Sequence, residues 1–166
     1  MISPELLRRY PFFAGLTHEH LVILADAAEE MSVETGYTFF KEEDKLDHFY
    51  LLVKGSVGIG MAVPDRDVKH NVSGQLLGEL QTKNVVVSTI GTGDVFAWSA
   101  LIPPNFSTAG GTALTDCQVI AFDAVKLRRL FEEQPDFGYL MSIKAGQLIR
   151  GRLRDLRIES LATYTN

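Results

Sequence analysis

The chain has 166 residues, a length that suits one domain with its own hydrophobic core. Hydrophobic residues make up 46% and charged residues 22%, a globular balance that excludes a disordered protein. The net charge of −5 argues against a protein that coats DNA or RNA, because that role needs a basic surface, so we expect no direct binding of nucleic acid.

Two helices are predicted at the N-terminus, within residues 1–30. The first begins at Ser3-Pro4-Glu5, which combines a capping hydroxyl, a proline in the first turn and an acidic residue, and it ends before Pro11. The second begins at Thr17. Apolar side chains fall on one face of this second helix, namely Leu21, Leu24, Ala25 and Ala28.

The periodicity changes at about Met31. Short runs of β-forming residues follow, separated by turn residues: YTFF, FYLLV, SVGIGMAV, VVVSTI and CQVIAF. Residues 64–83 are polar apart from one possible strand in LLGEL, and we expect an extended hairpin or loop there. Many short strands with no helices between them predict an antiparallel roll or sandwich over residues 31–122.

Helical periodicity returns at Asp123, a predicted cap for AVKLRRLFEE. Pro135 opens a last, long helix that reaches about Ala162, so helices occupy residues 123–163. We therefore expect residues 1–166 to form a single domain. Its predicted fold class is mainly β with flanking helices: an antiparallel, jelly-roll-like β-roll with a long C-terminal helix.

Several motifs in this order resemble the cyclic-nucleotide-binding domain family, which catabolite-activator-type regulators, kinase regulatory subunits and gated channels share. PFFAGLTHEHL (11–21) is similar to the family's opening helix, and TGYTFFKEEDKLDHFYLLVKGSV (35–57) to its β-roll signature. TIGTGDVF (89–96) is similar to the lead-in to the phosphate-binding cassette, and KLRRLFEEQP (126–135) to the start of the C-terminal helix pair. The resemblance implies a small pocket that the last helix closes, in a protein that is regulatory and not an enzyme.

The resemblance places the phosphate-binding cassette at residues 93–114, where the sequence departs from the family pattern. The family pattern is Phe-Gly-Glu, a short apolar helix and then Pro-Arg-Ala-Ala; the glutamate accepts the ribose hydroxyl and the arginine pairs with the cyclic phosphate. Here Ala97 stands for the glycine, Trp98 for the glutamate, and Ser107 or a neighbour for the arginine. The Gly-Glu pair in LLGEL precedes the cassette and is not part of it. The pocket candidates are Phe96, Ala97, Trp98, Ser99, Ala100, Leu101, Ser107, Thr108 and Ala109.

The absence of the family's glutamate and arginine, the two residues that anchor the nucleotide, predicts altered or lost recognition of cAMP and cGMP. Deleting one partner of a buried ion pair costs about 3–5 kcal/mol, or roughly two to four powers of ten in affinity. Two sources of compensation remain open: backbone amides at the start of the short helix, and a guanidinium from Arg150 or Arg152 of the last helix. Solvated flank charge is the alternative for these arginines. No cofactor is expected beyond a cyclic nucleotide or another small ligand.

Trp98 leaves two interpretations open: a plug that fills the pocket, or a wall on which a flat ligand stacks. The first predicted function is a ligand-sensing regulatory domain, and the alternative is a degenerate scaffold for dimerisation or for a protein partner. A third is the sensor part of a transcription regulator, without the helix-turn-helix domain of the catabolite-activator architecture. Free volume beside Trp98 favours sensing, whereas filling by Trp98 and Phe106 favours the scaffold.

The last helix is predicted to mediate a homodimer, because the β-roll is expected to leave its apolar stripe uncovered. This stripe consists of Met141, Ala145, Leu148, Leu153 and Leu156.

No metal site is expected, since none of the four histidines (18, 20, 48 and 70) has a second ligand at a suitable spacing. The single Cys117 excludes an internal disulfide bond and is expected to be a buried packing residue. The sequence has no signal core and no apolar stretch that could cross a bilayer. We therefore predict a cytoplasmic protein with no membrane contact.

Overall fold

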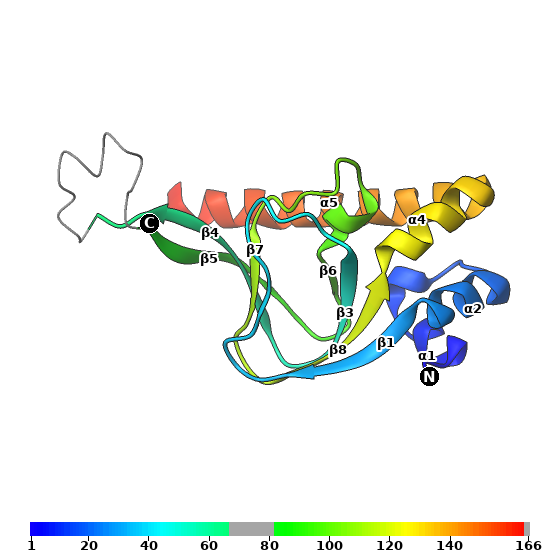
Figure 1. Ribbon diagram of the computed structural model, residues 1–166. Coiled ribbons are helices and arrows are strands. Elements are labelled where there is room, and N and C mark those ends of the chain that lie inside the picture. The colour runs from blue at the N-terminus through cyan, green and yellow to red at the C-terminus, as the bar shows by residue number, and fades with distance from the viewer. Residues whose placement is uncertain (67–81, 165–166) are drawn as a thin grey trace.

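The computed structural model describes residues 1–66 and 82–164, which form a β-roll with helices at both ends (Figure 1). The N-terminal elements are α1 (Pro4–Arg8), the 3-10 turn η1 (Pro11–Phe13) and α2 (His18–Asp26). The roll contains β1 (Ala28–Val33), β2 (Thr38–Phe40), β3 (His48–Lys54), β4 (Val57–Pro64), β5 (Thr82–Ile90), β6 (Val95–Phe96), the 3-10 turn η2 (Trp98–Leu101), β7 (Gly110–Ala113) and β8 (Cys117–Asp123). The C-terminal helices are α4 (Ala124–Glu133) and α5 (Pro135–Tyr164).

Two four-stranded antiparallel sheets form the roll, one in the order β1-β8-β3-β6 and the other in the order β2-β7-β4-β5. Alternate side chains point into the space between the sheets and fill it. In the first sheet Phe49 lies opposite Phe122, and their rings stack with centroids 4.6 Å apart. Cys117 is 2% exposed, as expected of a packing residue. The predicted fold class is confirmed.

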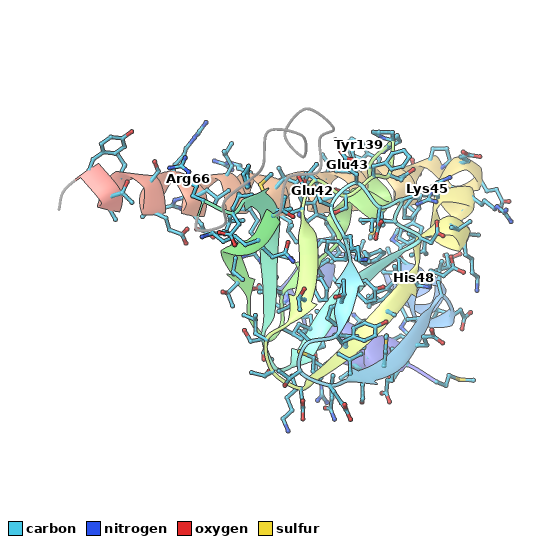
Figure 2. All side chains as sticks on the ribbon, turned by 60° about the vertical axis from the view of Figure 1, so that its left-hand side comes forward. Glu42, Glu43, Lys45, His48, Arg66 and Tyr139 are labelled. Atoms are coloured by element: carbon cyan, nitrogen blue, oxygen red, sulfur yellow. The ribbon has the colours of Figure 1, made fainter. Side chains whose placement is uncertain are left out.

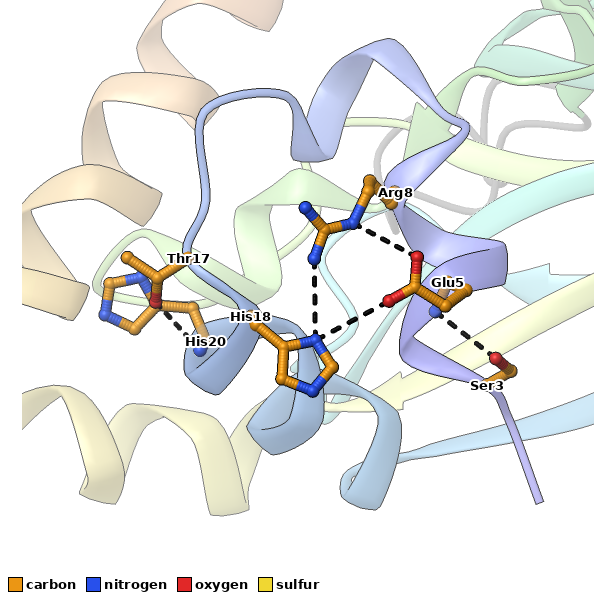
Figure 3. A network of polar contacts seen from close by, with 6 residues as sticks. All are labelled: Ser3, Glu5, Arg8, Thr17, His18 and His20. Carbon is orange, nitrogen blue, oxygen red and sulfur yellow. Dashed lines mark hydrogen bonds and ion pairs between the residues drawn. The ribbon is translucent and has the colours of Figure 1, made fainter.

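The N-terminal helices begin where their capping residues predict. The Ser3 hydroxyl accepts a hydrogen bond from the Glu5 N–H, and the Thr17 hydroxyl accepts one from the His20 N–H (Figure 3). Each bond satisfies a backbone donor that the first turn of a helix leaves free. An ion pair between Arg8 and Glu5, 3.3 Å apart, lies beside the first cap.

Three features of the roll differ from the sequence prediction. β1 begins at Ala28, so Ala28 belongs to a strand and not to the apolar face of α2, and the roll starts before Met31. The run AEEMSV carries little β pattern of its own, but six residues pair with β8. β7 lies inside the predicted cassette, where two glycines hide its strand character. LLGEL and His70 lie outside the described residues.

α5 divides into a buried first half and an exposed second half. Met141 and Ala145 are 1% and 0% exposed and pack within their own chain. Their assignment to an exposed dimer stripe was therefore wrong: the N-terminal half of α5 packs on the core, where Phe137 stacks on His20 with ring centroids 4.5 Å apart. From Leu153 onward every described residue of α5 is exposed (Figure 2).

Arg128 of α4 holds the cassette in place through hydrogen bonds. The Arg128 guanidinium donates hydrogen bonds to the carbonyl oxygens of Ala100, at 2.6 Å, and Leu46, at 3.4 Å. The Asn105 side-chain amide donates to the Ser99 and Ala100 carbonyls at 3.2 and 3.0 Å. The Ser99 carbonyl also accepts from the Ile102 N–H, whereas the Ala100 carbonyl accepts from these two side chains, which satisfy it at the end of the short turn.

Gly146→Ala is expected to stabilise the protein by about 0.5–1 kcal/mol, because glycine inside a helix costs that much relative to alanine. A Cβ atom at Gly146 has no neighbour within 4 Å. Gly138→Ala is the matched control: a Cβ there lies 2.8 Å from the Cβ of Phe131, so this variant should be less stable than the parent. Urea unfolding measures both changes, and equal effects of the two variants would contradict the packing described here.

Arg128→Met is expected to lower the free energy of unfolding by about 1–3 kcal/mol, because two carbonyl groups lose a charged donor. Arg129→Met is the control, since Arg129 is the exposed neighbour on the same helix and should change stability by less than about 0.5 kcal/mol. Urea unfolding measures the free energy of unfolding of both variants. If the two values agree within error, Arg128 does not hold the cassette.

Candidate functional site

A cavity of about 360 Å³ lies between the cassette, the strands β4 and β5, and the C-terminal half of α5. Its size falls within the range of pockets that bind small organic molecules. The cassette residues that line it are Phe96, Ala97, Trp98, Ser99, Ser107, Thr108 and Ala109. The lining residues of α5 are Arg152, Asp155, Leu156 and Glu159. The cavity is thus the space that the resemblance assigns to a ligand.

The cavity does not include three of the residues predicted for it. Ala100 is 0% exposed and belongs to the core, and Leu101 packs against that core, so neither side chain lines the cavity. Arg150 does not line the cavity either, whereas Arg152 does. Two residues along a helix lie about 200° apart around its axis, so both arginines cannot face the cassette.

The backbone at Ala97 has the conformation that the glycine of the family motif would favour. Its φ of 60° and ψ of 32° place it in the left-handed region. That region costs a residue with a Cβ roughly 1–2 kcal/mol. β6 precedes Ala97 and pairs with β3 through Tyr50 and Phe96, so both flanks of this residue are fixed. The cassette therefore keeps its turn with alanine at this position.

Trp98 borders the cavity without filling it. Its side chain is half-buried, and free volume remains beside it. Phe106, the second residue considered as a plug, is 49% exposed and is not among the lining residues. The pocket described here is therefore open at Trp98.

Aromatic packing supports the cassette wall from the side of the first sheet. Phe96 stacks on Tyr50 with ring centroids 5.1 Å apart, and Phe39 contacts both rings at the same distance. Burial raises the pKa of the Tyr50 phenol to about 12, and the neighbouring Tyr37 adds to the shift. The phenol therefore stays neutral at physiological pH and brings no charge to the cassette.

The charged groups at the cavity come from α5 and not from the cassette. Arg152 is the one cation among the described lining residues, and its guanidinium lies 3.4 Å from the Asp94 carboxylate. Asp155 and Glu159 also line the cavity, but neither side chain forms a hydrogen bond or ion pair within residues 1–66 and 82–164. The sequence prediction named Arg152 and missed both acids. Their signal was the spacing of three and four residues that follows Arg152.

The other predicted compensation for the missing arginine is weak in this structure. η2 is a 3-10 turn of four residues, so few peptide dipoles align at its start. The Ser107 hydroxyl, a candidate for the place of the family's arginine, donates to the Ala109 carbonyl and accepts from the Ala109 N–H. Neither feature provides a positive charge.

The described residues lack the features of a metal site and of a membrane-spanning helix. They contain no group of three or more histidine, cysteine or carboxylate residues placed to hold a metal ion. No helix in these ranges is long and apolar enough to span a bilayer.

Comparison with known proteins identifies similar domains in regulators. A solved structure from Geobacter metallireducens, provisionally named a cyclic nucleotide-binding protein, is 30% identical with a TM-score of 0.74 and covers 92% of this chain and 99% of its own. A CRP-like cAMP-activated global transcriptional regulator of Mycobacterium tuberculosis is 23% identical over 153 residues, 92% of this chain and 58% of that protein. A cAMP-dependent protein kinase regulatory subunit of Colletotrichum orbiculare is 34% identical over 80 residues, 48% of this chain and 20% of that protein.

The chain thus spans less than two thirds of the length of these curated relatives. Residues 30–134, which run from β1 to the end of α4, match the family described as the cyclic nucleotide-binding domain. The chain belongs to the cyclic nucleotide-binding domain family.

Proposed function

We propose that this chain is a regulatory domain that senses a small ligand in the cavity beneath α5 and recognises cAMP and cGMP weakly or not at all. The observation that carries the proposal is an open cavity beside Trp98 whose cassette wall contains neither a carboxylate nor a cation. The regulatory roles in the names of the two curated relatives support the first part of the proposal. The lost anchors support the second part.

The energetic argument concerns the cyclic phosphate. A buried anion without a partner is costly, and Ser107 offers only a neutral hydroxyl that is already bonded to Ala109. Asp94 already offsets the charge of Arg152 and would compete with a phosphate for it, and Arg152 also lines the cavity together with the carboxylates of Asp155 and Glu159. The cavity therefore suits a ligand that does not depend on an arginine clamp.

Ligand occupancy reaches the rest of the protein through α5. The same helix lines the cavity with Arg152, Leu156 and Glu159 and carries the exposed C-terminal turns. A ligand shifts a conformational equilibrium by the difference in its affinity for the two states. A ligand that contacts α5 binds one position of the helix better than another, and this difference is the regulatory signal.

The exposed turns of α5 pair with a second copy of the chain. Large apolar side chains project from these turns, namely Leu153, Leu156, Ile158, Leu161 and Tyr164. Such a surface marks an interface, and a two-fold pairing buries the same surface on both copies. Around the helix axis Leu161 lies about 180° and Leu153 about 100° from Arg152, so these two side chains can pair without entering the cavity, whereas Leu156 also lines it.

The exposed helix also favours a second candidate function, a scaffold that dimerises or binds a protein partner without a ligand. Its supporting feature is the apolar surface after Leu153, whereas the open cavity favours sensing. The similarity to a transcriptional regulator supports a role as the sensor part of a longer cytoplasmic regulator. Binding of a ligand in the cavity separates sensing from the scaffold.

Calorimetric titration of the parent protein with cAMP or cGMP is expected to give a dissociation constant near the millimolar range or no measurable heat. The double variant Trp98→Glu/Ser107→Arg restores both anchors and should bind cAMP at least tenfold more tightly than the parent, because the phosphate gains a charged partner.

The matched control is Trp98→Glu/Ser32→Arg, which puts the same charge on an exposed position of β1. It should bind cAMP no better than the parent. A low-micromolar dissociation constant for the parent protein would disprove the weak-recognition part of the proposal.

Light scattering of the parent at micromolar concentration is expected to give the mass of a dimer, and Leu153→Asp/Leu161→Asp should give that of a monomer. Two carboxylates in an apolar interface face desolvation and repulsion from their copies. Gln147→Asp, on an exposed position of the first half of α5, is the control and should leave the dimer intact. A monomeric parent would rule the pairing out.

A further inference from the structure

The walls and the mouth of the cavity differ in chemistry. The walls are largely apolar: Phe40, Leu46, Val95 and Phe96 line the cavity and are each less than 8% exposed. Hydroxyl groups of the cassette and β5 add neutral hydrogen-bonding partners, namely Ser88, Thr89, Ser99, Ser107 and Thr108. A ligand body that fills this space must therefore be largely apolar, with neutral polar groups at most.

The mouth is acidic. Arg152, Asp155 and Glu159 are three and four residues apart, so they lie on one face of α5. Asp94 offsets the charge of Arg152 at 3.4 Å, while Asp155 and Glu159 have no cationic partner in the part of the chain that the structure describes. Two carboxylates without an ion-pair partner among the described residues therefore line the cavity.

We propose that the cavity selects a ligand with an apolar body and a positively charged nitrogen, such as an amine or amidine, over one with an anionic group. This inference rests on the proposed function and names the ligand class for the same site. A cation at the mouth gains attraction from Asp155 and Glu159, whereas an anion meets repulsion unless it displaces Asp94 from Arg152. Trp98 adds an aromatic face on which a cation is favoured.

Three probes with the same phenyl ring and two-carbon spacer test the charge preference: 2-phenylethylamine, 2-phenylethanol and 3-phenylpropanoate, which are cationic, neutral and anionic at neutral pH. Trp98 is the only tryptophan in the chain and lines the cavity, so its fluorescence reports occupancy. At low salt the amine should bind roughly tenfold more tightly than the acid, and the alcohol should have an intermediate affinity. Added salt should reduce these differences in affinity.

The variant Asp155→Asn/Glu159→Gln should bring the affinities of the amine and the alcohol together and leave that of the alcohol unchanged. Glu132→Gln/Glu133→Gln removes the same charge from exposed positions of α4 and should keep the parent's preference. The single variants Asp155→Asn and Glu159→Gln should each remove part of the preference for the amine over the alcohol.

Two results overturn the inference in distinguishable ways. If the alcohol binds but the acid binds as tightly as the amine, or if the preference survives Asp155→Asn/Glu159→Gln, the charge selection is wrong and the sensing cavity stands. If none of the three probes changes the Trp98 fluorescence, the cavity does not admit small ligands, and the proposed function fails together with the inference.

Discussion

The hydrogen bonds from Arg128 and Asn105 to the carbonyl groups of η2 are the constraint on which the site depends. They hold the short turn in place through two side chains that do not line the cavity, and the Ala100 carbonyl accepts from both of them. On the other side, β6 pairs with β3 and fixes the strand that leads into Ala97. The cassette is thus shaped by groups that never face the cavity. Its lining side chains can change without loss of the turn, which is consistent with our interpretation that Trp98 and Ser107 stand where the family pattern has a glutamate and an arginine.

α5 combines two roles in one helix because its surroundings change along its length. Its first half is anchored by Phe137 and Met141 in the core and by Lys144, which donates a hydrogen bond to the Ala14 carbonyl. Burial lowers the pKa of the Lys144 ammonium, so this contact carries a desolvation cost. The second half lines the cavity on one face, and its described residues from Leu153 onward are exposed. A long helix with a buried start and an exposed end gains stability from further packing, which both the ligand and a second copy provide in our proposal.

Features that depend on neighbouring residues were predictable from the sequence, and features set by distant ones were not. The caps at Ser3, Thr17 and Asp123 are local hydrogen bonds, and the structure has each of them. β1 was missed because apolar and polar residues alternate poorly within its own six residues. Pairing with β8, almost a hundred positions away in the sequence, holds them in a strand. The stripe on α5 was read as one surface, since periodicity shows which residues share a face but not where the core ends along a helix.

The same limit applies to the charged groups of the site. The sequence shows arginines at positions 150 and 152 with equal claim to the pocket, and only the rotation of α5 against the roll separates them. The carboxylates of Asp155 and Glu159 were missed for the same reason, because the family pattern directs attention to the cassette.

Placing the charged groups on the helix rather than on the cassette changes what a ligand acts upon. A charge on the cassette holds a ligand against a wall that Arg128 and β3 keep fixed. A charge on α5 transmits the attraction of the ligand to the helix itself, because Asp155 and Glu159 lie on the turns that also carry Leu153 and Leu161. If a cationic ligand neutralises these carboxylates, their mutual repulsion along α5 falls and the helix turns between them are stabilised. Ligand binding and the pairing of the exposed turns would then be coupled through one helix, and by thermodynamic reciprocity dimerisation would tighten the binding of the cation.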